Sequence, residues 1–82
     1  MDYKRFKQFV DNNFAKYFGE GINLLPYTKV KEKLKKDFVR IYTDNNSIDV
    51  DINKLYEEYK VMGYIDELLR YTAENIKKKL VR

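Results

Sequence analysis

The chain has 82 residues, with 17 lysines and arginines against 13 aspartates and glutamates, for a formal net charge of +4. It contains no cysteine, histidine or tryptophan, which excludes a disulfide-stapled fold, a zinc finger and chemistry based on thiol or imidazole groups. Its 8 tyrosines and 5 phenylalanines argue against disorder, and no apolar run approaches the roughly 20 residues of a membrane span. We therefore expect one small, soluble domain of cytosolic type over residues 1–82.

Residues 3–18 are predicted to form an amphipathic helix. Apolar side chains recur along it at intervals of three and four residues and make one broad stripe. Asp2 is the expected N-cap, and Gly19 and Gly21 supply the stop. The stripe consists of Tyr3, Phe6, Phe9, Val10, Phe14 and Tyr17.

Residues 22–36 fit two structures. In a strand, the lysines at alternate positions share one face, and Val30 and Leu34 lie on the other. In a helix, Pro26 lies near the start, and Tyr27, Val30 and Leu34 form the inner stripe. Proline is compatible with an edge strand and with a first helical turn. The period alone does not decide, and a strand is the preferred interpretation.

Residues 38–52 carry the pattern of an antiparallel hairpin with one solvent-exposed face. The first strand, residues 38–43, is rich in β-branched and aromatic side chains, and turn-forming residues follow it. The second strand, residues 47–52, alternates strictly between apolar and acidic positions. Its apolar face consists of Ile48, Val50 and Ile52, and its acidic face of Asp49 and Asp51.

A short helix is predicted directly after the hairpin. Asn53 is its candidate N-cap, and Gly63 ends it. Its inner positions are Leu55, Tyr59 and Met62, which follow the helical period.

The last predicted helix covers residues 64–80. Acidic side chains lie in its first turn and lysines in its last, which suits the helix dipole. Its inner stripe consists of Ile65, Leu68, Leu69, Thr72, Ile76 and Leu80. The order α-β-β-β-α-α predicts an α+β domain, with an antiparallel three-stranded sheet, or a hairpin alone, packed against helices.

A distinctive motif joins the second strand of the hairpin to the following helix. It has the form apolar-Asn-x-apolar-Tyr-x-x-Tyr and reads Ile52-Asn53-Lys54-Leu55-Tyr56-Glu57-Glu58-Tyr59, followed by Gly63 and Ile65-Asp66-Glu67-Leu68. In these features about half of the chain resembles an uncharacterised family of domains of unknown function from Gram-positive gut bacteria. The resemblance implies an opening helix, a sheet and this strand-to-helix junction, and it implies no activity.

Residues 29–40 form a basic stretch with six positive and two negative side chains. On a strand its alternate lysines would lie about 6.6–6.8 Å apart, a spacing that suits a phosphate backbone or an acidic protein surface. The alternative is a solvated face, or an edge strand protected by lysine. Few arginines and no loose aromatics occur here, so readout of bases is not indicated. The candidate binding residues are Lys29, Lys31, Lys33, Lys35, Lys36 and Arg40.

Residues 44–67 are acidic, with seven carboxylates and two lysines, so this segment carries −5 and the overall +4 leaves +9 for the remainder. Such an asymmetry fits a patch for a basic partner, and equally the ordinary surface charge of a hairpin and helices.

Three tyrosines fall beside the apolar stripes of the last two helices, as in a protein interface or at the solvent-exposed edge of a core. The candidate patch is Tyr56, Tyr64 and Tyr71, with Glu57, Glu58 and Glu67 as its polar rim.

No catalytic, metal or cofactor site is indicated. Ser47, the only serine, lies in a turn and has no histidine to activate it. The acidic residues around this turn do not make a calcium loop, because Ile48, Asp49 and Leu55 occupy positions that need an oxygen ligand, a glycine and a glutamate. We therefore expect a protein that is not an enzyme.

These features favour a small non-enzymatic binding protein that docks stoichiometrically on a protein or a protein–nucleic acid complex. Its size and element order resemble accessory proteins of phages and mobile elements, including some CRISPR inhibitors. Its net basic charge argues against whole-molecule mimicry of DNA. A nucleic-acid-binding protein that uses Lys29–Arg40 is one alternative, and a structural module of a larger assembly is another. No membrane partner is expected.

Overall fold

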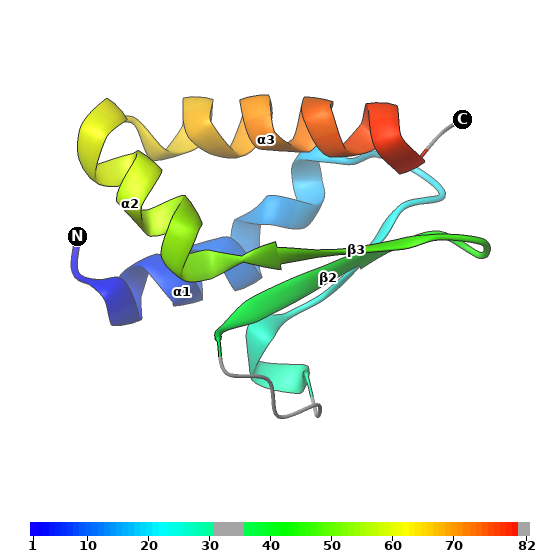
Figure 1. Ribbon diagram of the computed structural model, residues 1–82, viewed down its shortest axis with the longest axis horizontal. Coiled ribbons are helices and arrows are strands. Elements are labelled where there is room, and N and C mark those ends of the chain that lie inside the picture. Colours follow the sequence, from blue (N-terminus) through cyan, green and yellow to red (C-terminus); the bar gives the residue numbers. More distant parts are fainter. Residues whose placement is uncertain (31–35, 81–82) are drawn as a thin grey trace.

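The computed structural model describes residues 1–30 and 36–80 (Figure 1). Its helices and strands confirm the predicted α+β fold with an antiparallel three-stranded sheet. In chain order the elements are α1 (Tyr3–Asn13), the 3-10 helix η1 (Phe14–Tyr17), β1 (Asn23–Leu25), the 3-10 helix η2 (Tyr27–Lys29), β2 (Phe38–Tyr42), β3 (Ser47–Asp51), α2 (Ile52–Met62) and α3 (Ile65–Leu80).

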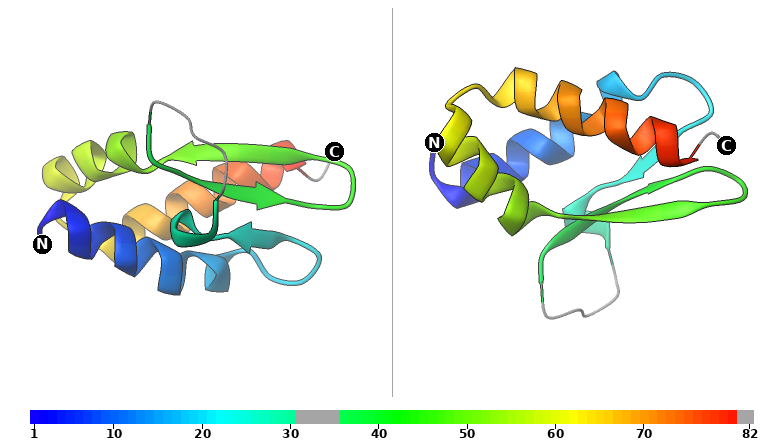
Figure 2. Two further views of the ribbon diagram at one scale, coloured as in Figure 1. Left: turned by 90° about the horizontal axis from the view of Figure 1, so that it is seen from below. Right: turned by 45° about the horizontal axis from the view of Figure 1, so that its top comes forward.

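The sheet has the order β1-β2-β3, and both strand pairs are antiparallel. Opposite Ile41 of β2 lie Leu24 of β1 and Ile48 of β3, so these side chains share one face. That face looks toward the helices, with α3 running over it (Figure 1). The view from below in Figure 2 shows β2 between the other two strands, with β1 and β3 as the edges.

The core lies between α1, α3 and the inner face of the sheet. Phe6, Val10 and Phe14 from the first helical segment, Ile41 from β2 and Leu69 from α3 are all completely buried. The predicted apolar stripes of both long helices therefore meet in one cluster. Ala73 of α3 also belongs to this cluster, a position that the apolar pattern did not single out.

The first helix begins as predicted and changes its winding before its expected end. The Asp2 carboxylate accepts a hydrogen bond from the Arg5 N–H at 2.8 Å and caps α1. At Asn13 the backbone leaves α-helical geometry, with φ −125° and ψ −20°, and the amide of this side chain donates to the Phe9 carbonyl at 3.0 Å. A 3-10 turn follows, and it places the Phe14 and Phe18 rings edge to face at 4.9 Å.

Neither interpretation describes residues 22–30, the main part of this range that the structure describes. Within them a strand forms at Asn23–Leu25, and the 3-10 turn η2 follows Pro26. Proline has no N–H for a sheet hydrogen bond, and the Asp11 carboxylate of α1 accepts the N–H groups of Tyr27 and Thr28 instead. The prediction of an extended lysine face is therefore wrong at its first residue, Lys29, which lies in η2.

The start of α2 also differs from the prediction. The N-cap is Asp51, the last residue of β3, whose carboxylate accepts the N–H groups of Asn53 and Lys54 at 3.0 and 3.3 Å. Asn53 lies inside the helix, and Ile52, predicted as the end of the strand, is its first residue. The hairpin therefore passes into α2 without a loop. Gly63 ends α2 with φ +80°, as predicted.

Candidate functional site

A groove of about 460 Å³ lies between α2 and α3. Gly63 reverses the chain here, so the last turns of α2 and the first turns of α3 stand next to each other. We call it the α2–α3 groove. Its lining residues are Lys54, Glu57, Glu58, Val61, Met62, Leu68 and Tyr71.

The α2–α3 groove exposes large apolar side chains above a buried floor. Val61 is 89% exposed, Tyr71 64% and Met62 41%, whereas Leu68 beneath them is 1% exposed. Isolated exposed apolar residues are normal on a protein surface, whereas here three of them gather around one hollow. The prediction that Met62 points into the core is wrong, because the last turn of α2 extends beyond the sheet.

The structure brings together three residues of the predicted aromatic and acidic patch. Tyr71, Glu57 and Glu58 line the α2–α3 groove, with the acidic pair on α2 facing the tyrosine on α3. Tyr64 is 66% exposed and lies at the junction of the two helices, outside the groove lining. Glu67 is exposed in the first turn of α3 and also lies outside the lining.

Tyr56, which was predicted to be an anchor, lies outside the lining of the α2–α3 groove. Its ring is only half-buried, but it packs at 5.1 Å from the Phe6 ring and 5.3 Å from the Tyr3 ring. Its hydroxyl donates a hydrogen bond to the Met1 carbonyl at 3.0 Å. The reason is that α2 contacts α1 as well as α3, so it has a second inner side that the single apolar stripe did not reveal. Tyr56 therefore joins two helices and is not a free anchor.

Sequence reasoning missed Val61, the most exposed apolar side chain of the groove. It interrupts a polar helix face one residue before Met62 and two before the helix-ending glycine. The signal available for it was an apolar residue off the inner stripe, close to a predicted glycine stop.

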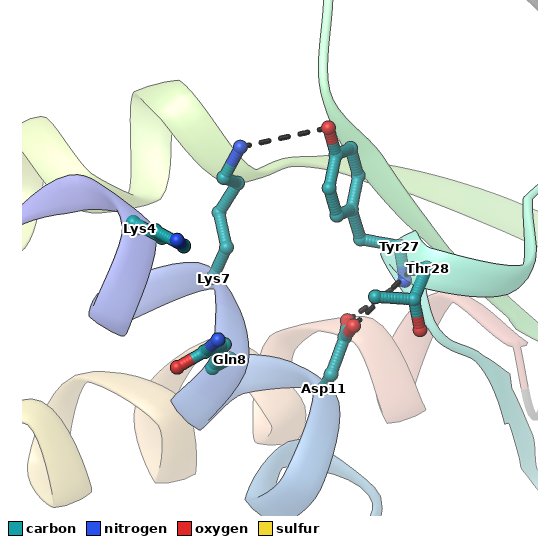
Figure 3. Close-up of a pocket in the computed structure, with 6 residues that line it drawn as sticks. All are labelled: Lys4, Lys7, Gln8, Asp11, Tyr27 and Thr28. Carbon is teal, nitrogen blue, oxygen red and sulfur yellow. Dashed lines mark hydrogen bonds between the residues drawn. The ribbon is translucent and has the colours of Figure 1, made fainter.

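A second, polar groove runs between α1 and η2. It consists of two adjoining hollows of about 200 and 310 Å³ that share Gln8, Asp11 and Thr28. Figure 3 shows Lys7 and Asp11 projecting from α1 toward Tyr27 and Thr28 of η2, with Lys4 and Gln8 beside them in the lining. We call it the α1–η2 groove.

The charged groups of the α1–η2 groove are largely used within the protein. Asp11 accepts the backbone N–H groups of Tyr27 and Thr28 at 2.7 and 3.2 Å, which fixes η2 against α1 (Figure 3). The Lys7 ammonium lies 4.5 Å from the centre of the Tyr27 ring, 4.8 Å from that of Tyr3 and 3.5 Å from the Asp37 carboxylate. Such a lysine stabilises the fold and is poorly placed to bind an external anion.

Asp37 is the carboxylate on which this cluster converges. Tyr3 donates its hydroxyl to it at 2.7 Å, and this hydrogen bond, together with the nearby Lys7 ammonium, holds the pKa of Asp37 below its ordinary value of 3.8. Burial of Tyr3, and then the negative charge of Asp37, raises the pKa of the Tyr3 hydroxyl. The pair remains a phenol donating to a carboxylate at neutral pH.

The predicted basic stretch is only partly within the described residues. Lys31, Lys33 and Lys35 lie outside them. Lys36 is exposed, with its ammonium 4.0 Å from the Asp51 carboxylate. Arg40 lies on the outer face of the sheet, where its guanidinium pairs with Asp49 of β3 at 2.8 and 3.3 Å. Arg40 is therefore engaged in a cross-strand ion pair, which opposes a role in phosphate binding.

Within residues 1–30 and 36–80 no helix is both long enough and apolar enough to cross a membrane. In the same part of the chain, no three acidic side chains gather as a metal site would require. Comparison of the chain with protein-family models, with curated proteins and with solved structures finds no match.

Proposed function

We propose that this protein is a small non-enzymatic binding protein, which docks stoichiometrically on a protein or a protein–nucleic acid complex through its α2–α3 groove. The observation that carries the proposal is the exposure of Val61, Met62 and Tyr71 around a hollow of about 460 Å³. Tyrosine and methionine are enriched at protein interfaces, and tyrosine is among the residues that contribute most of the binding energy there.

The rim of the groove defines the chemistry of the partner. Glu57 is paired with Lys60 at 2.9 Å, whereas Glu58 forms no ion pair within the part of the chain that the structure describes. An apolar anchor side chain would fill the hollow against Tyr71, and a lysine or arginine beside that anchor would meet Glu58. The partner segment is therefore apolar with a flanking positive charge.

The size and element order of the chain support the more specific proposal that it is a cytoplasmic accessory protein of the kind that phages and mobile elements carry, such as an inhibitor. Such a protein acts by occupying a surface of its target, so its effect saturates near one copy per target. An effect at far lower ratios would instead mean turnover and would contradict the proposal.

The test begins with capture of the partner from the native host after nuclease treatment, and continues with titration of the purified partner. Tyr71→Ala is expected to weaken binding by about 2 kcal/mol or more, about thirtyfold in dissociation constant. The same change is expected to lower the free energy of unfolding by less than about 1 kcal/mol, because the ring is mostly exposed.

Lys29→Ala is the matched control, because Lys29 is exposed on the other groove. It is expected to leave the dissociation constant unchanged. Binding that is lost after nuclease treatment, or that Lys29→Ala weakens while Tyr71→Ala does not, would favour the nucleic-acid alternative and overturn the proposal.

A further inference from the structure

The sulfur atoms of this chain belong to two methionines, Met1 and Met62, because the sequence contains no cysteine. It also lacks histidine and tryptophan. Hydrogen peroxide converts the thioether of an accessible methionine to a sulfoxide, and cellular reductases reverse this change. Sulfur oxidation in this protein is therefore confined to two side chains, and each of them can be followed separately.

Both methionine side chains reach solvent, but they lie in different surroundings. Met1 is 50% exposed and Met62 41%. Met1 precedes α1, where its carbonyl accepts the Tyr56 hydroxyl at 3.0 Å. Met62 is the last residue of α2 and lines the α2–α3 groove, whereas Met1 lies outside that lining. A peroxide molecule can reach both sulfur atoms, but only the oxidation of Met62 places a new polar group in this groove.

The neighbours of Met62 in the groove are apolar. Val61 and Tyr71 are largely exposed beside it, and the buried Leu68 forms the floor. A thioether is flexible, polarisable and apolar, so it can pack against an apolar side chain of a partner. A sulfoxide is polar and its oxygen is a hydrogen-bond acceptor, so it loses water when such a side chain covers it and gains no donor in return.

The partial exposure of Met62 separates an effect on binding from an effect on folding. In the free protein, water can solvate a sulfoxide at this position, so the fold is expected to tolerate it. In the complex the partner covers the groove and removes this water. Oxidation of Met62 is therefore expected to cost more at the binding step than at the folding step.

We propose that Met62 is a reversible oxidation site and that its oxidation by a peroxide weakens binding at the α2–α3 groove. In the forward reaction the sulfur gives two electrons to hydrogen peroxide, the O–O bond breaks, one oxygen joins the sulfur and the other leaves as water. In the reverse reaction methionine sulfoxide reductases, with a dithiol as reductant, return the thioether and release water and a disulfide. This inference concerns the regulation of the proposed function and rests on that function for the existence of a partner.

The first part of the test is oxidation of the full chain by hydrogen peroxide, without any partner. Peptide mass spectrometry is expected to find one added oxygen on Met62 and one on Met1, and the far-ultraviolet circular dichroism spectrum is expected to stay that of the folded chain. Addition of oxygen to Met1 alone would show that the fold shields the Met62 sulfur and would overturn the inference. Loss of the folded spectrum would assign Met62 to the core and would overturn it as well.

The second part compares binding of the reduced and oxidised chains to the partner that is captured with the reduced chain. Oxidation is expected to raise the dissociation constant by about tenfold, the usual scale for one unpaired buried polar group. Treatment of the oxidised chain with both epimer-specific reductases is expected to restore the original value. An effect that these enzymes do not reverse would mean damage and not regulation, and would contradict the proposal.

Two variants of Met62 provide matched controls, because Met1 remains in both. Met62→Leu has a similar volume and no sulfur, so it is expected to bind with the natural affinity and not to respond to peroxide. Met62→Gln places a polar amide at the same position and is expected to weaken binding without peroxide. A response to peroxide that persists in Met62→Leu would assign the effect to Met1 and overturn the inference.

Tyr71→Ala separates failure of this inference from failure of the proposed function. If Tyr71→Ala weakens binding and oxidation does not, oxidation control is rejected and the groove remains the binding surface. If neither change affects binding, or if no partner is captured, both the proposed function and this inference are rejected.

Discussion

Asp37 contacts both α1 and the start of α2. Its carboxylate accepts the Tyr3 hydroxyl of α1 and lies 3.5 Å from the Lys7 ammonium, while its carbonyl accepts the Ile52 N–H at the start of α2. The side chain is partly exposed, so its charge is screened by water, yet its partners are held in place by packing. A single side chain thus connects the first helix to the beginning of the hairpin.

The lowered pKa of Asp37 predicts a specific dependence of stability on pH. The folded state holds the carboxylate form more strongly than the unfolded chain does, so this contribution is complete above the ordinary pKa of 3.8 and is lost as the pH falls through the lower folded value. Asp37→Asn is therefore expected to be less stable than the natural chain at neutral pH, and the difference should shrink under acid. Urea unfolding at a series of pH values measures it, with Asp44→Asn on the exposed turn as control.

Tyr3→Phe gives an independent check, because the Tyr3 hydroxyl is the main cause of the lowered Asp37 pKa. Removing it should move that pKa back toward 3.8, which NMR titration of the carboxyl carbon would report. This account would be contradicted if the difference in unfolding free energy between the natural chain and Asp37→Asn stayed constant down to strongly acidic pH.

At the scale of elements, the junction of β3 and α2 makes the sharpest prediction. Asp51 caps α2 through two N–H groups, and Asn53 lies within the helix. Asp51→Ala is expected to cost about 1 kcal/mol of unfolding free energy, the usual effect of losing an N-cap. Asn53→Ala is expected to change it by less than about 0.5 kcal/mol. Chemical denaturation of both variants measures the difference, and a reversed order would restore Asn53 as the cap.

Elements whose signal is local were predictable from the sequence. The strict alternation of residues 47–52 and the three-and-four spacing in α1 and α3 depend on the nearest neighbours in the chain alone. The 3-10 turn at Tyr27–Lys29 was not predictable in this way, because the Asp11 carboxylate that holds it comes from another helix. The switch from strand to helix at Asp51 was missed because aspartate also fits the exposed face of a strand.

The candidate site shows the same limit of sequence-based prediction. Residues whose exposure depends on one helix were predictable, and a residue that a distant helix covers was not. The exposure of Tyr71, Glu57 and Glu58 was predictable because they fall off an apolar stripe, and exposure of such residues follows from the period of one helix. Tyr56 also falls off that stripe, but α1 covers it, and α1 is far away in the sequence. A single helical period cannot reveal that a helix is covered from two sides.

At the scale of the whole molecule, the small core leaves little reserve of stability. A chain of this length has a free energy of unfolding of about 4–8 kcal/mol. Phe14 is completely buried, so Phe14→Ala is expected to cost about 3–5 kcal/mol, more than half of the free energy of unfolding at the midpoints of the two ranges. Far-ultraviolet circular dichroism with denaturant titration measures this, with the exposed Tyr64→Ala as control. A Phe14→Ala protein as stable as the natural chain would show that other packing compensates for the lost ring.

The attachment of α1 has a consequence for synthesis of the chain in the cell. The hydroxyls of Tyr3 and Tyr17 find their acceptors, Asp37 and Asp66, 34 and 49 positions later in the chain. At about 5–20 residues per second, a ribosome exposes the aromatic stripe of α1 for several seconds before α3 exists to cover it. Within these residues α1 is synthesised before the strands and helices that cover it, so its aromatic stripe stays accessible to chaperones until they follow.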